Sequence, residues 1–90
     1  MKLTADVMVT TPRVQMLKRC FDAELASMQT ERSTVQIHTT KESMQFSVSA
    51  TDSTALRATL NTITKLLTAF EKAAENENDS TRKNTTAANH

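Results

Sequence analysis

Polar and apolar residues alternate along three short segments of the chain. In residues 2–10 the apolar side chains fall on the odd positions, with Met8 as the exception, and the same two-residue period recurs in residues 33–39 and 44–50. A period of two predicts a β-strand with one buried face and one polar face. The polar link Thr40-Lys41-Glu42 is short, so the second and third strands are predicted to form a hairpin.

Two further segments repeat with the period of an α-helix. The first opens at Thr11-Pro12, because Thr is a good cap and Pro is favoured at the first helical position. Its apolar stripe follows at three- and four-residue steps: Val14, Leu17, Phe21, Leu25 and Met28. The second helix is predicted to begin at a cap formed by Thr51 or Asp52 and to run to about Glu75.

The second predicted helix carries two apolar rows. The first row is Leu56, Leu60, Ile63, Leu67, Phe70 and Ala74. The second row, roughly 100° around the helix, is Ala55, Thr59, Thr62, Leu66, Ala69 and Ala73. We expect the first row to hold the helix to its core and the second to face a protein partner. The alternative is that the second row packs on the first helix, along an edge formed by Met16, Cys20 and Ala23.

The length of the second predicted helix also indicates a surface available to a partner. A helix of about 24 residues spans roughly 36 Å, whereas strands of seven or eight residues span only about 25 Å. We therefore expect around two turns, carrying Leu66, Leu67 and Phe70, to overhang the sheet and to favour association.

The order strand–helix–strand–strand–helix restricts the topology. A right-handed crossover places the first two strands parallel, and the hairpin then inserts the third strand between them. The predicted fold is α+β with two layers: a three-stranded antiparallel sheet of order 1-3-2, with two helices on the face of Leu3, Val35 and Phe46. Residues 1–75 form this domain, and the Asn- and Thr-rich residues 76–90 are expected to be a disordered polar tail.

Composition narrows the function classes. A domain of this size lies near the stability limit, and with one Cys it has no disulfide framework, which favours oligomerisation or a partner. The net charge is +1 with scattered Lys and Arg, and neither Trp nor Tyr is present, which argues against a dedicated nucleic-acid binder. A free Cys20, no signal peptide in Met1–Thr10 and no membrane-spanning run predict a cytoplasmic protein, with the nucleus possible in a eukaryote.

The chain contains no glycine, which excludes several kinds of site. Phosphate-binding loops, the dinucleotide fingerprint, the nucleophile elbow and the GxxG clamp of KH domains all require glycine. His38 lies in an alternating strand and Cys20 mid-helix, and neither has a partner at metal-ligand or nucleophile–base spacing. We therefore expect no catalytic residues, no metal and no cofactor, and Asp52 is interpreted as a helix cap.

The run from Val48 to Asn61, with Ala50, Asp52 and the Leu56-Arg57-Ala58 step, carries a family signature. It resembles the small Pcc-type (CTAG/Pcc) subunit of the KEOPS complex, also called EKC, and the Glu31-Arg32-Ser33 step is similar as well. The resemblance implies a non-catalytic subunit that dimerises and docks through its helices onto the threonylcarbamoyl-transferase subunit. The complex installs threonylcarbamoyl-adenosine in tRNA. The family fold, two helices on a three-stranded sheet, agrees with the fold predicted from the residues.

The partner-binding residues expected from the apolar rows and the resemblance together are Ala55, Leu56, Arg57, Leu60, Asn61, Ile63, Leu66, Leu67 and Phe70. On spacing alone, Arg57 and Asn61 are interpreted as part of a solvent-exposed face. The resemblance favours a role for both in an interface. The expected partners are the transferase subunit and either a second copy or a small paralogue, with tRNA contacted only through the complex and no membrane. Two alternatives stay open, a KH-like RNA-binding module and a stand-alone homodimeric scaffold.

Overall fold

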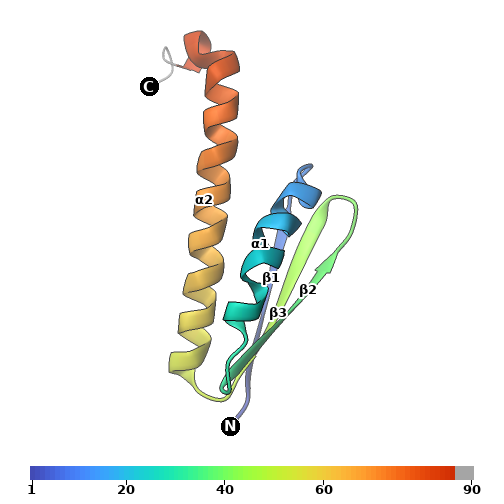
Figure 1. The fold of residues 1–90 in the computed structure, drawn as a ribbon, viewed down its shortest axis with the longest axis vertical. Coiled ribbons are helices and arrows are strands. Elements are labelled where there is room, and N and C mark those ends of the chain that lie inside the picture. Colours follow the sequence, from blue (N-terminus) through green and yellow to red (C-terminus); the bar gives the residue numbers. More distant parts are fainter. Residues whose placement is uncertain (87–90) are drawn as a thin grey trace.

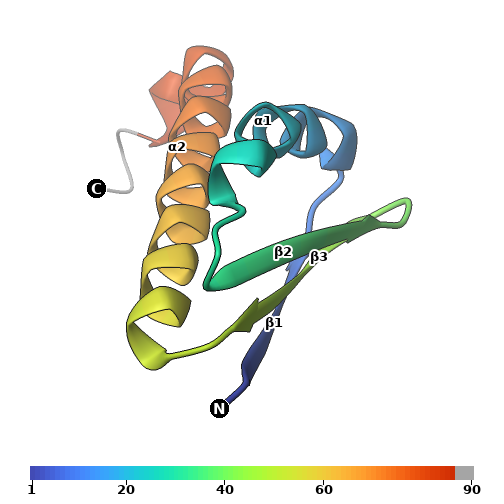
Figure 2. The same ribbon diagram turned by 60° about the horizontal axis from the view of Figure 1, so that its bottom comes forward.

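The computed structural model describes the backbone of residues 1–86 and the side chains of residues 1–74. Its elements follow in the order β1 (Leu3–Thr10), α1 (Val14–Met28), β2 (Ser33–Thr39), β3 (Ser43–Ala50) and α2 (Ser53–Thr86). The three strands form one antiparallel sheet in the order β1-β3-β2, and both helices lie on the same face of it (Figures 1 and 2). The predicted α+β fold and its strand order are therefore confirmed.

The central strand β3 fixes the register of both edge strands. Phe46 is opposite Val7 in β1 and opposite Ile37 in β2, so the three inward side chains form one row across the sheet. On the other face, polar residues such as Asp6, Gln36 and His38 are exposed to solvent. The two-residue period of the sequence thus sorts each strand into a helix-covered face and an open polar face.

The core lies between this sheet and the two helices. Phe21 of α1 and Phe46 of β3 are both fully buried, and their rings meet edge to face with centroids 4.6 Å apart. The remaining buried members of the cluster are Leu17, Met28, Val35, Met44, Val48 and Ile63. Every element except β1 contributes a buried residue to it.

No described residue has a positive φ, so the turns are built without the left-handed backbone that glycine adopts most readily. In the β2–β3 hairpin the Thr40 amide donates to the Ser43 carbonyl at 2.9 Å, and the two hydroxyls lie 2.6 Å apart. The Thr11 amide donates to the Glu42 carbonyl at 2.8 Å, which fastens the end of β1 to the hairpin. Thr11 Oγ1 accepts from the Arg13 amide at 3.1 Å, so Thr11 and Pro12 form a turn before the helix begins at Val14.

The helix α2 is longer than predicted. It continues past Glu75 to Thr86, and Figure 1 shows it extending well beyond the sheet. The helix thus includes 76–86, where the sequence analysis expects a disordered tail, and extending an existing helix is far less costly than nucleating one. The rest of the expected tail, 87–90, lies outside the described residues, and the domain boundary at residue 75 stays a prediction.

The expected position of the overhang is also wrong. Leu66, Leu67 and Phe70 pack against the core instead of extending past it. The physical reason is that α2 begins directly after β3, so its first 18 or so residues span about the same length as an eight-residue strand. Within the described residues, neither helix is long and apolar enough to cross a membrane.

Candidate partner-binding surfaces

The buried line of α2 runs along Ala55, Thr59 and Ile63, which are spaced four residues apart and are at most 6% exposed. This line passes between the two rows distinguished in the sequence. Ala55 and Thr59 were expected to face a partner, and the structure instead places them inside the molecule. The expected division between a core row and a partner row is therefore wrong at these two positions.

A hydroxyl network explains why Thr59 lies inside. Its Oγ1 donates to Ser33 Oγ at 3.0 Å, and Ser33 Oγ also lies 3.0 Å from Thr30 Oγ1. Buried hydroxyl groups require hydrogen-bond partners, and the two buried hydroxyls, those of Ser33 and Thr59, bond to each other. The network ties α2 to the start of β2, across 26 positions of sequence. No periodicity in the sequence could indicate this pairing, because it depends on where the two elements meet.

One flank of α2 lies toward α1, and we call it the covered flank, although its three alanines remain exposed. It consists of Ala58, Thr62, Leu66, Ala69 and Ala73. A cleft of about 400 Å³ lies at its lower end, lined by side chains of the last turn of α1, of the loop to β2 and of α2. The lining includes Ser27, Thr30, Ala58 and Thr62, which are small or hydroxyl-bearing. Small side chains along a helix allow another helix to approach closely.

The opposite flank of α2 faces β1, and we call it the open flank. It consists of Leu56, Leu60, Leu67 and Ala74, none of which is fully buried. A second cleft of about 440 Å³ lies at its upper end, between α2 and the end of β1. This cleft is lined by Val9, Thr10, Thr11, Leu67, Phe70, Glu71 and Ala74. Apolar surface is therefore accessible on this side of the helix.

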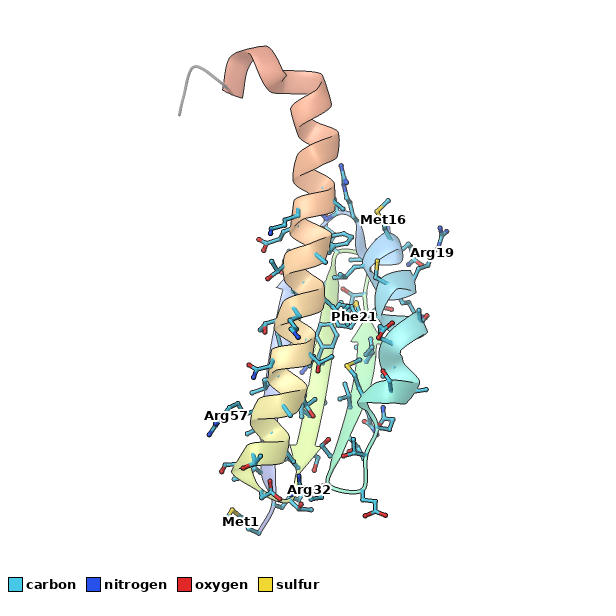
Figure 3. All side chains as sticks on the ribbon, turned by 60° about the vertical axis from the view of Figure 1, so that its left-hand side comes forward. Met1, Met16, Arg19, Phe21, Arg32 and Arg57 are labelled. Atoms are coloured by element: carbon cyan, nitrogen blue, oxygen red, sulfur yellow. The ribbon has the colours of Figure 1, made fainter. Side chains whose placement is uncertain are left out.

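The nine predicted partner-binding residues fall into three groups. Ala55 and Ile63 are buried, which leaves their side chains little surface to offer a partner. The half-buried group is Leu56, Leu60, Leu66, Leu67 and Phe70. Arg57 and Asn61 are exposed, and Figure 3 shows Arg57 pointing away from the body of the molecule. Among residues 1–74, the Arg57 side chain has no hydrogen bond or ion pair. Helical spacing puts Arg57 and Asn61 opposite the buried line, with Arg57 nearer the open flank and Asn61 nearer the covered flank.

Two stretches singled out in the sequence meet at the start of α2. Asp52 Oδ1 accepts from the Ala55 amide at 2.8 Å, which confirms Asp52 as the helix cap. Its other oxygen, Oδ2, lies 3.1 Å from Nη1 of Arg32, and the Thr51 amide donates to the Arg32 carbonyl at 2.9 Å. Figure 3 shows Arg32 at this end of the molecule. The Glu31-Arg32-Ser33 step and the signature run thus form one structural unit.

Comparison with known families identifies the family to which this unit belongs. The model of the Pcc1 family, described as transcription factor Pcc1, matches residues 2–75 and so covers most of the chain. The chain belongs to the Pcc1 family. Pcc1 proteins are subunits of the KEOPS/EKC complex, and membership implies a role as such a subunit in transcription or tRNA modification. Comparison of this Pcc1-family chain with curated proteins finds no match, and comparison with solved structures finds none either.

The Pcc1 family is one of non-catalytic complex subunits, so the surfaces of this chain matter more than its clefts. In the described part of the chain, no group of three or more His, Cys, Asp or Glu side chains is placed to hold a metal ion. The free Cys20 is exposed on α1. Two surfaces therefore remain as candidates for binding: the outer surface of the helix pair, which includes the covered flank, and the open flank beside β1.

Proposed function

We propose that this Pcc1-family chain is a dimerisation and assembly subunit of the KEOPS/EKC complex. It docks through its helices onto the threonylcarbamoyl-transferase subunit and supports threonylcarbamoyl-adenosine modification of tRNA without contacting tRNA itself. We place it in the cytoplasm, or in the nucleus as well if its source is a eukaryote. The observation that carries the proposal is the family match over residues 2–75, on a fold whose two helices both lie on one face of the sheet.

The outer surface of the helix pair supports helix-to-helix docking. The exposed small residues Ala58, Ala69 and Ala73 recur along α2, and α1 offers Ala23 and Ala26 on its exposed side. Small residues let a partner helix approach to within 8–10 Å between axes, so that apolar side chains of the partner reach half-buried Leu66. This mode of binding needs neither a deep pocket nor a catalytic group.

A matched pair of substitutions on α2 tests the docking surface. Ala69→Arg adds a long charged side chain to the covered flank, whereas Thr68→Arg adds the same group to the solvent side of the helix one residue earlier. We expect Ala69→Arg to reduce co-purification of the transferase subunit at least tenfold and Thr68→Arg to leave it nearly unchanged. Equal co-purification by both variants would contradict docking through this surface. A steep salt dependence of tRNA binding by the isolated chain would instead favour an RNA-binding module.

A further inference from the structure

The cleft at the lower end of the covered flank, here called the lower cleft, has chemical features that docking between small side chains does not use. It measures about 400 Å³ and is lined by helix residues, among them Ala58 and Thr62, and by the loop residues Thr30, Glu31 and Arg32. Ala58 and Thr62 also belong to the covered flank. A partner helix that lies along this flank therefore passes over the lower cleft and can place a side chain in it.

Glu31 gives the lower cleft an uncompensated negative charge. The other charged residue of the lining, Arg32, has a counter-ion, because Nη1 of Arg32 lies 3.1 Å from Oδ2 of Asp52. Within residues 1–74, the exposed Glu31 carboxylate has neither a hydrogen bond nor an ion pair. The lining thus keeps a net negative charge once Arg32 and Asp52 neutralise each other, and Glu31 is available to a cation from outside the chain.

The end of α1 adds partial negative charge at the same place. The helix ends at Met28, which lines the lower cleft together with Ser27. The C-terminal end of a helix carries roughly half a negative elementary charge, which a basic residue in the last turn can offset. The last turn of α1 contains no basic residue. The helix end and Glu31 therefore attract the same kind of group, a cation.

Two hydroxyl groups of the lining are left as hydrogen-bond acceptors. Ser27 Oγ donates its proton to the Glu24 carbonyl at 2.8 Å, and Thr62 Oγ1 donates to the Ala58 carbonyl at 3.1 Å. A hydroxyl has one proton and two lone pairs, so each oxygen can still accept when its proton is engaged inside its own helix. An ionised carboxylate such as that of Glu31 is likewise only an acceptor. The lower cleft thus matches a group that is positively charged and rich in N–H donors.

We propose that the lower cleft binds the side chain of an Arg or Lys from the helix of the transferase subunit that docks on the covered flank. The inference rests on the proposed function and names an anchor point within it. The cationic group donates to the Glu31 carboxylate and to the hydroxyl oxygens of Ser27 and Thr62, and a guanidinium can form two parallel bonds to one carboxylate. A protein side chain, and not a free cation, fits because the lower cleft is continuous with the docking flank.

The anchor also fixes the position of the partner along α2. The exposed alanines of the covered flank allow close approach at several heights and do not distinguish one height from another. The upper part of the helix pair carries the exposed Arg19 of α1 and Lys72 of α2, and Figure 3 shows Arg19 far from Arg32 at the lower end. Like charges repel, so a partner cation is favoured at the lower cleft and disfavoured at the upper end.

Two matched charge reversals test the anchor. Glu31 and Glu42 are both exposed loop residues, but Glu31 lines the lower cleft and Glu42 lies in the β2–β3 hairpin. Calorimetric titration with the purified transferase subunit should show a roughly tenfold higher dissociation constant for Glu31→Gln, since the partner cation then loses its counter-ion, and a still higher one for Glu31→Arg. Glu42→Arg should change it less than about twofold, because salt screens a distant charge. Circular dichroism should be unchanged for all three.

A compensating substitution in the partner identifies the cation. Each Arg and Lys of the docking helix of the transferase subunit is replaced in turn by Glu and titrated against the wild-type and Glu31→Arg chains. One of these variants should bind Glu31→Arg more tightly than it binds the wild type, because the reversed pair again joins opposite charges. A purely structural role of Glu31 would produce no such exchange of preference.

Three outcomes would overturn the anchor. They are a Glu31→Arg chain that binds as tightly as the wild type, equal weakening by Glu31→Arg and Glu42→Arg, and the absence of any compensating variant on the docking helix. The proposed function has its own test in Ala69→Arg, which lies outside the lower cleft. Weakening by Ala69→Arg without weakening by Glu31→Arg rejects the anchor and leaves docking through the covered flank standing. If neither substitution weakens binding, both the anchor and docking through that flank are wrong.

Discussion

The two edges of the sheet differ more than their positions suggest. Both edge strands pair in antiparallel fashion with β3, and both present an inward side chain beside Phe46. At the β2 edge, however, Val35 and Ser33 are buried beneath α1 and α2, whereas the inward residues of β1 remain half-exposed. Two helices on three strands thus cover the start of the β2 edge fully and leave the inward residues of β1 half-exposed.

The largest expected difference concerns the apolar side chains of the two edges. Phe21→Ala removes a fully buried ring that packs on Phe46, so it should lower the free energy of unfolding by roughly 3–5 kcal/mol. Leu67→Ala on the open flank should cost only roughly 1–2 kcal/mol, because the side chain is already partly exposed to water. Urea unfolding, at a protein concentration where the oligomeric state is constant, measures both. Equal losses would show that the β1 side is as tightly packed as the β2 side.

A smaller effect is expected from the polar contacts that hold the β2 side. Asp52→Ala removes the cap of α2 and the contact with Arg32, and the cap alone is worth roughly 0.5–2 kcal/mol. The ion pair adds little, since both of its side chains are largely exposed. Thermal unfolding should show the loss, while the neighbouring Glu31→Ala serves as a control with little effect. A loss no larger than that of the control would mean that Asp52 does not cap the helix in solution.

The smallest effect concerns the buried hydroxyl on α2. Thr59→Val keeps the shape of the side chain and removes its hydrogen bond to Ser33, which should cost about 1 kcal/mol. Thr64→Val is the matched control, since its hydroxyl bonds the Asn61 carbonyl on the exposed side of the same helix. Chemical denaturation of both variants, with Ser33→Ala to complete a double-mutant cycle, separates the pair energy from the effect of burial. Coupling near zero between Thr59 and Ser33 would contradict the bond.

Most of the fold could be predicted because strand periodicity and topology rules agree. The alternation in residues 2–10 identified β1 to within a residue, and the hairpin around Lys41 then required β3 to lie in the middle. The C-terminal end of α2 could not be predicted in the same way. Residues 76–86 have no apolar period, and their helix continues from a segment that is already formed. Local composition alone therefore could not predict where the helix ends.

The candidate surfaces were harder to predict for a specific reason. Both rows of α2 contained residues small or apolar enough to be buried, and periodicity does not say which flank another element will cover. The answer depends on Thr59 reaching Ser33, which is a contact between elements distant in sequence. Arg57 and Asn61, by contrast, were predicted from a family signature, and the structure leaves both exposed.

The central position of β3 has a consequence for the order of folding. The β2–β3 hairpin closes over a turn of three residues, whereas β1 reaches β3 only after the chain has closed a loop that includes α1 and β2. We therefore expect the hairpin and α1 to form the nucleus and β1 to join after the rate-limiting barrier. Substitutions in β1 should then accelerate unfolding and leave the folding rate nearly unchanged. The strand with the free edge would be the last to join the sheet and the first to leave it.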